Sequence, residues 1–150
     1  MRPVVEYGSS AWDPHRGNKS QVDALESVQR KAARFVCADW RCRSSVSAMI
    51  CSLNWESLQE RRARARVSLF HKAFYHHVAI PMSLFTFSTA PMTTRGAHQK
   101  FVPPHCRTLA FQNTFVPAVV PLWNDLSPEV TTISDPEVFR AKLCAVKLCV

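Results

Sequence analysis

The distribution of proline divides this chain into a part that can form long helices and a part that cannot. The segment from Trp55 to His77 contains neither glycine nor proline. Its apolar residues recur at helical spacing, at Leu58, Ala65, Leu69 and Ala73. Proline lacks a backbone N–H and its ring clashes with the preceding turn, so the six prolines between Pro81 and Pro121 exclude a long helix there. The sequence therefore predicts a mainly α fold, with loops and short extended pieces after Ile80.

Another helix is predicted from about Gln21 to Ala38, with Ser20 as N-cap and Asp23 at its third position. Its apolar stripe comprises Val22, Leu25, Val28, Ala32, Phe35 and Val36. Advancing about 100° per residue places Arg30, Lys31 and Arg34 opposite that stripe. We therefore expect a helix with one apolar side and one basic side.

Shorter elements complete the prediction of about four to five helices. Ser45 is expected to cap a helix that ends near Asn54, and Ser134 to cap a last helix in which Phe139 and Leu143 face the core. Between them, Lys100–Pro103 is expected to pair with Leu109–Val116 as a short β-hairpin. Trp123 and Leu126 are expected to anchor a short turn of helix against the core.

Composition and charge restrict the class of protein. The 150 residues, 47% of them hydrophobic, suffice for a single domain spanning 1–150. The formal charge of +8 favours an acidic partner, nucleic acid first and an anionic membrane next. Up to Tyr75 the chain has 13 Lys plus Arg against 7 Asp plus Glu, so 1–80 is the basic helical half and 81–150 the proline-rich half.

No stretch is apolar for long enough to span a membrane, and the N-terminus does not resemble a signal peptide. We therefore expect an intracellular protein, nuclear or cytoplasmic, that is not secreted, does not bind a membrane and keeps its six cysteines reduced. The sequence leaves its oligomeric state open.

The candidate binding residues are Arg30, Lys31, Arg34, Arg41 and Arg43. The last two follow the basic helix and adjoin Ser44 and Ser45, where guanidinium groups and the amides of a helix start could hold a phosphate. The alternative is that Asp39 pairs with one arginine while the serines only cap.

A second basic cluster comprises Arg61, Arg62, Arg64 and Arg66. These residues spread around their helix, which argues against a single binding face. We expect Arg62 to be an interior residue paired with a carboxylate and Arg64 to pair with Glu60 four residues earlier. The pattern leaves the roles of Arg61 and Arg66 open.

Neither metal binding nor catalysis is indicated. The pairs Cys37/Cys42 and His71/His76 do not have zinc-ligand spacing, and no nucleophile elbow, P-loop or dinucleotide fingerprint is present. We therefore expect no enzyme activity, no catalytic residue, no metal and no cofactor.

Five short phrases occur in order along almost the whole chain. They begin at Arg2 Pro3, Leu25 Glu26, Leu53, Thr94 Arg95 Gly96 and Trp123 Asn124. They are similar to the phrases RPxxEYxxxxWxP, LExxQRRAxRF, LxWxxLxxRR, TRG and WNxLP. The chain therefore resembles the region after the polymerase core in reverse transcriptases of non-LTR retrotransposons, the LINE-type, Jockey-like elements.

The resemblance implies a truncated copy without polymerase activity. Polymerases of that family hold two metal ions with carboxylates that include an Asp-Asp pair, and this chain has no such pair. The expected function is that of a non-catalytic remnant whose basic helix contacts phosphates of RNA or DNA. The alternative is a structural helical module that docks on the polymerase core of a related element.

Overall fold

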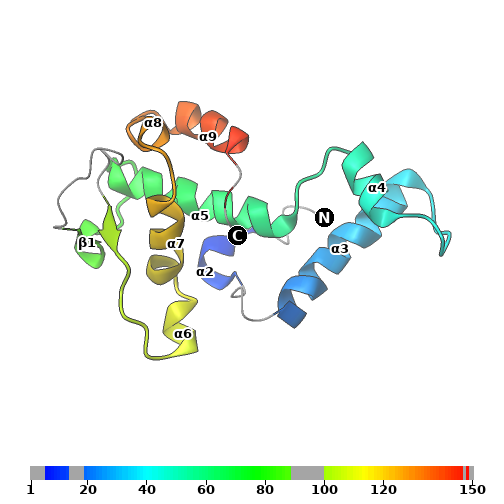
Figure 1. Cartoon of the computed structure of the whole chain (residues 1–150), viewed down its shortest axis with the longest axis horizontal. Coiled ribbons are helices and arrows are strands. Elements are labelled where there is room, and N and C mark those ends of the chain that lie inside the picture. The colour runs from blue at the N-terminus through cyan, green and yellow to red at the C-terminus, as the bar shows by residue number, and fades with distance from the viewer. Residues whose placement is uncertain (1–5, 14–18, 89–99, 147, 149–150) are drawn as a thin grey trace.

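The computed structural model describes residues 6–13, 19–88, 100–146 and 148. Helices dominate it, and a small two-stranded antiparallel sheet lies at one end (Figure 1). The elements are α2 (Ser9–Trp12), α3 (Lys19–Cys37), α4 (Val46–Ser52), α5 (Leu58–Phe74), the 3-10 helix η1 (Met82–Leu84), β1 (Thr86–Phe87), β2 (Phe101–Val102), α6 (Leu109–Gln112), α7 (Phe115–Asn124), α8 (Pro128–Thr131) and α9 (Pro136–Ala145). The prediction of a mainly α fold is confirmed.

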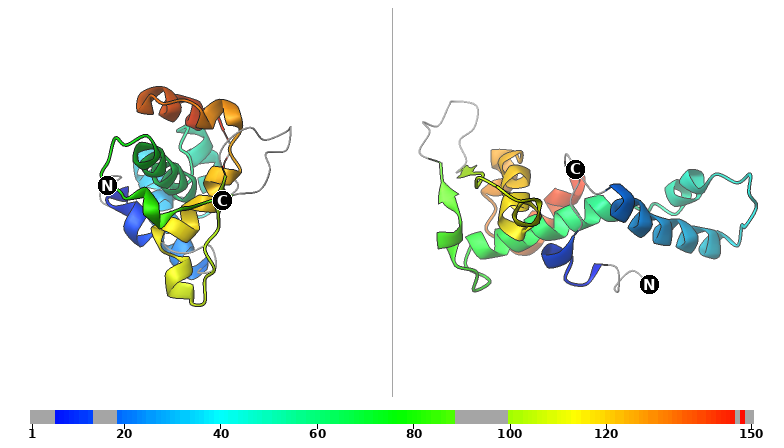
Figure 2. Two further views of the ribbon diagram at one scale, coloured as in Figure 1. Left: turned by 90° about the vertical axis from the view of Figure 1, so that its left-hand side faces the viewer. Right: turned by 90° about the horizontal axis from the view of Figure 1, so that it is seen from below.

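Helix α5 is the centre of the molecule, and α2, α7 and α9 pack around it (Figures 1 and 2). It is shorter than the predicted Trp55–His77, because Ser57 is its N-cap and accepts a hydrogen bond from the Glu60 amide at 3.1 Å. Ser57 and Glu60 have the spacing of a capping box, so the sequence did contain this signal. Of the predicted stripe, Leu58 and Ala73 are buried, whereas Ala65 is exposed.

Several aromatic rings contact one another within the core. The ring of Phe70, which is fully buried, lies 4.7 Å from that of Phe85, 4.8 Å from Trp123 and 5.2 Å from Phe101, measured between centroids. Edge-to-face contacts at such distances stabilise beyond the burial of area alone. Trp123 thus anchors α7 against α5, and the expectation that it and Leu126 face the core is confirmed.

The predicted hairpin was wrong in its pairing. Phe101 pairs with Phe87 of β1, and Leu109–Val116 is helical except around Asn113 and Thr114. The Thr108 hydroxyl starts α6 by accepting a hydrogen bond from the Phe111 amide at 3.2 Å. On the other side of β2, the Asn124 side chain accepts from the Phe101 amide at 3.0 Å and donates to its carbonyl at 2.8 Å.

Helix α7 forms although it contains two prolines. Pro117 is its third residue, where the amide of any residue would lack a partner within the helix. Pro121 gives up one helical hydrogen bond, and the burial of Val119, Val120 and Trp123 offsets that loss. Helix α7 therefore extends over 10 residues, where the sequence predicted loops and short extended pieces.

The last helix begins one residue later than predicted. Its N-cap is Asp135, not Ser134, and the Asp135 carboxylate accepts hydrogen bonds from the amides of Val138 at 3.1 Å and Glu137 at 2.7 Å. These bonds lower the pKa of Asp135. Phe139 and Leu143 are buried as expected.

Side chains near the end of α5 hold the segment between α8 and α9. His71 is buried and its Nε2 lies 2.6 Å from the Ile133 carbonyl oxygen, while the Tyr75 hydroxyl donates to the Thr131 carbonyl at 2.8 Å. A carbonyl can only accept, so Nε2 of His71 carries the proton. Burial lowers the pKa of His71, because the charged form is poorly solvated there.

Candidate nucleic-acid interface

Helices α3 and α4 and the loop between them form an arm that extends from the body (residues 19–55, the arm). The loop of residues 38–45 lies at the far end of the molecule in both Figure 1 and the right-hand view of Figure 2. Among the described residues, the main core runs from Ala63 to Leu148 and takes no buried residue from the arm. The buried residues of the arm therefore pack separately from the main core.

Two polar contacts join the arm to the start of α5. The Gln29 side chain, buried, donates to the Glu56 carbonyl at 2.7 Å. The Glu26 carboxylate accepts from the Gln59 amide at 3.0 Å and so caps α5 from outside. A carboxylate is favourable there because a helix N-terminus carries partial positive charge. These contacts orient the arm relative to the body.

The buried side of α3 differs from the predicted stripe. Gln29 and Ala33 are buried, whereas Phe35 is 75% exposed and Val36 56% exposed. On the helical wheel, Phe35 lies about 160° from Ala33. Packing against α4 and the start of α5 thus rotates the buried face away from Phe35. The helix also starts at Lys19, so Ser20 lies inside it and is not its N-cap.

Hydrogen bonds fix the backbone where α3 ends. Ala38 has φ 49°, in the left-handed region, its amide donates to the Phe35 carbonyl at 3.3 Å and the Asp39 amide donates to the Arg34 carbonyl at 3.1 Å. This is a Schellman motif with alanine where glycine is usual. The Arg34 guanidinium then donates to the Arg41 carbonyl at 3.0 Å and to the Asp39 carbonyl at 3.4 Å. Arg34 therefore has a structural role that the sequence did not reveal.

The Asp39 carboxylate also holds the loop. It accepts from the Arg41 amide at 3.0 Å, and a hydrogen bond from the Ser44 side chain is the largest cause that lowers the pKa of Asp39. The expected alternative, Asp39 paired with an arginine, is thus replaced by bonds to a hydroxyl and an amide. Ser45 caps α4 as predicted, with its hydroxyl accepting from the Ala48 amide at 3.3 Å. That amide is consequently not free for a phosphate.

Of the remaining predicted cations, Arg41 and Arg43 lie on this fixed loop, and Arg30 and Lys31 lie before it on α3. Arg30, Lys31, Arg41 and Arg43 are all exposed, and none forms an ion pair with another residue that the structure describes. From Arg30 to Arg43 the sequence has five cations and one carboxylate. The predicted site residues are thus divided between α3 and the loop, and Arg34 supports the loop through its two carbonyl contacts.

The arginines of the second basic cluster form ion pairs within the protein. Asp13 accepts from both Arg62 and Arg66, each at 2.6 Å, and the Arg62 side chain is fully buried. The expectation for Arg62 is confirmed, as is that for Arg64, which pairs with Glu60 at 3.1 Å and also with Glu56. Arg61 pairs with Glu6 at 2.8 Å.

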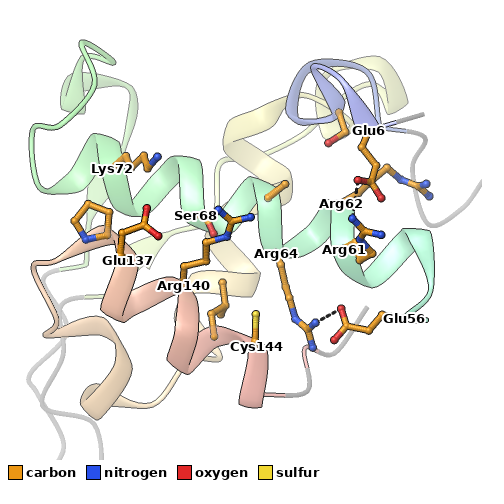
Figure 3. Close-up of a pocket in the computed structure, with 14 residues that line it drawn as sticks. Glu6, Glu56, Arg61, Arg62, Arg64, Ser68, Lys72, Glu137, Arg140 and Cys144 are labelled. Carbon is orange, nitrogen blue, oxygen red and sulfur yellow. Dashed lines mark hydrogen bonds and ion pairs between the residues drawn. The ribbon is translucent and has the colours of Figure 1, made fainter. Parts of the chain in front are cut away.

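A cavity of about 310 Å³ lies between α5 and α9 beside these pairs (Figure 3). Lys72, Arg140 and Ser68 line one end of it, and Arg61 and Glu6 line the other. Glu137 near Lys72 and Glu56 near Arg64 add negative charge on opposite sides of the cavity (Figure 3). Because the lining carries both signs and Arg61, Arg62 and Arg64 are paired, the cavity lacks the excess of positive charge found between Arg30 and Arg43.

The sequence also raised zinc binding and contact with a membrane. His71, which had been considered as a zinc ligand, stacks on Phe139 at 3.9 Å between ring centroids. Within the described ranges, no three His, Cys, Asp or Glu side chains gather as they would around a metal ion. No helix there is long and apolar enough to cross a membrane.

Comparisons of the chain with protein-family models, curated proteins and solved structures found no match.

Ala38→Gly is expected to stabilise the protein by about 1 kcal/mol, since glycine adopts a positive φ without the steric cost that alanine has there. Urea unfolding followed by circular dichroism measures the change. Ala24→Gly, at an exposed position inside α3, is the matched control and should destabilise by about 1 kcal/mol. A loss of stability in Ala38→Gly would contradict the left-handed conformation at that residue.

Proposed function

We propose that the arm binds RNA or DNA through phosphate contacts from Arg30, Lys31, Arg41 and Arg43. The observation that supports the proposal is the set of exposed cations without ion-pair partners among the described residues, on α3 and on the loop that Arg34 and Asp39 hold in one shape. Exposed guanidinium and ammonium groups contact phosphate oxygens without regard to sequence. The protein would therefore bind nucleic acid with little base specificity from these four residues.

The resemblance to non-LTR retrotransposon reverse transcriptases gives this proposal a biological setting. In that setting the chain is a non-catalytic remnant of the region after the polymerase core, and the arm holds template or primer. An intact element of this kind has to bind its template and primer next to its polymerase. A basic arm that projects from a compact body suits such a task.

The alternative function is docking on the polymerase core of a related element. The exposed apolar residues Phe35, Val36 and Trp40 favour it, because uncovered apolar surface often marks a protein contact. The two functions differ in their response to salt. Phosphate binding releases counterions and weakens steeply as salt rises, whereas apolar docking does not weaken in this way.

A fluorescence-anisotropy titration of the full chain tests the proposal. The ligands are a labelled RNA hairpin and a labelled DNA duplex, each at low and near-physiological salt. The test variant combines Arg30→Ala, Lys31→Ala, Arg41→Ala and Arg43→Ala. We expect it to lose at least about tenfold in affinity, and the slope of log affinity against log salt to fall by about 0.9 for each lost duplex contact.

A variant of equal charge on the body is the control. It combines Lys100→Ala, Arg107→Ala, Arg140→Ala and Lys142→Ala, all at exposed positions away from the arm. It should keep most of the affinity and of the salt slope. Equal losses in both variants would show that only net charge matters. No binding by the unmodified chain would overturn the proposal and favour docking.

A further inference from the structure

Two aromatic side chains stand exposed among the cations of the arm. Phe35 is 75% exposed and Trp40 is 62% exposed. Both adjoin arginines in sequence, Phe35 following Arg34 and Trp40 preceding Arg41. Exposed rings interleaved with cations are typical of proteins that bind single strands, where bases stack on the rings while the cations follow the backbone.

The backbone beneath both rings is held in place. The Phe35 carbonyl accepts from the Ala38 amide at 3.3 Å in the motif that ends α3. Trp40 lies between Asp39 and Arg41, the two residues whose carbonyls Arg34 binds. A ring on a fixed backbone loses less conformational freedom when a ligand stacks on it, which favours binding.

We infer that the arm prefers single-stranded RNA or DNA, with bases stacked on Trp40 and Phe35. The inference rests on the proposed function, because the same four cations supply the phosphate contacts. In a duplex the faces of the bases are already stacked on one another, so the rings would gain little there. Stacking does not depend on the sugar, so RNA and DNA strands are expected to respond alike to loss of a ring.

Charge favours nucleic acid over a membrane as the occupant of this surface. The Asp39 carboxylate lies between the two rings in sequence, and its pKa is lowered by its hydrogen bonds, so it stays charged at neutral pH. An element that inserts rings into a lipid interface presents them together on the apolar face of one helix, whereas Phe35 lies on α3 and Trp40 on the loop beyond it. A strand that passes over the loop can place phosphates on Arg41 and Arg43 and leave the carboxylate in water.

The test compares short single strands with a duplex of the same sequence. Trp40→Ala and Phe35→Ala are each expected to weaken binding of single-stranded RNA and DNA about tenfold. Binding of the duplex should change less than about twofold, and the salt slope should stay the same because no phosphate contact is lost. Phe111→Ala, at an exposed ring on α6, is the matched control and should leave both affinities unchanged.

Several outcomes would overturn the inference and leave the proposed function standing. One is equal binding of strand and duplex by the unmodified chain, with the loss in the four-cation variant retained. Another is unchanged single-strand affinity in both aromatic variants. A third is that Trp40→Ala weakens binding only to vesicles that contain phosphatidylserine, which would assign the rings to a membrane. Absence of all oligonucleotide binding would instead remove the proposed function itself.

Discussion

Asp13→Ala is expected to destabilise the protein by about 3–5 kcal/mol, the usual cost of leaving buried charges without their partner. Asp13 accepts from Arg62 and Arg66 at 2.6 Å, and the two arginine side chains are 0% and 10% exposed. Among the described residues, it is the only carboxylate that pairs with either of them. Its loss would also release the end of α2 from α5. Urea unfolding followed by circular dichroism provides the measurement.

Two further variants keep this test decisive if Asp13→Ala fails to fold. Asp23→Ala removes an exposed aspartate from α3 and should change stability by less than about 0.5 kcal/mol. The triple variant Asp13→Ala, Arg62→Met, Arg66→Met replaces the buried ionic group by apolar side chains and should recover much of the loss. If Asp13→Ala and Asp23→Ala had similar stabilities, the ion pairs would not support the fold.

Phe70→Ala is expected to cost about 3–5 kcal/mol, as large-to-small changes in well-packed cores do. Phe70 is fully buried and its ring contacts those of Phe85, Phe101 and Trp123, so it joins α5 to the strand pair and to α7. The change would open a cavity where three parts of the second half meet α5. The unfolding midpoint in urea measures the loss.

The matched control is Phe35→Ala, which removes the same side chain from a position that is 75% exposed. Its stability should change by less than about 0.5 kcal/mol. A comparable loss in the two variants would mean that Phe70 does not occupy the centre of the core.

Sequence reasoning predicted the helices well and their ends less well. The apolar periodicity indicated α3, α4, α5 and α9, although Phe35, Val36 and Ala65 of the predicted apolar stripes are exposed. Helix ends depend on single capping residues, and here Ser57 and Asp135 are the N-caps, whereas the sequence predicted a start at Trp55 and a cap at Ser134. Helix α7 was missed because proline is a local signal, whereas the burial that stabilises α7 comes from distant residues.

The candidate site, too, could be predicted only in part from the sequence. The cations of the arm could be identified from charge alone, and all but Arg34 are exposed. The role of Arg34 could not be predicted, since its acceptors are backbone carbonyls whose positions depend on how the chain turns after Cys37. The exposure of Phe35 could not be predicted either, because it depends on the direction from which α4 and α5 approach α3.

The side chain of Asn124 affects whether two copies of this protein can pair through their sheets. Edge strands with free amides and carbonyls are templates for pairing between molecules and hence for aggregation. Asn124 occupies both the amide and the carbonyl of Phe101 on the outer side of β2. A second molecule that extended the sheet at Phe101 would first have to displace a residue fixed at the end of α7. One amide side chain thus blocks extension of the sheet at Phe101 on the β2 side.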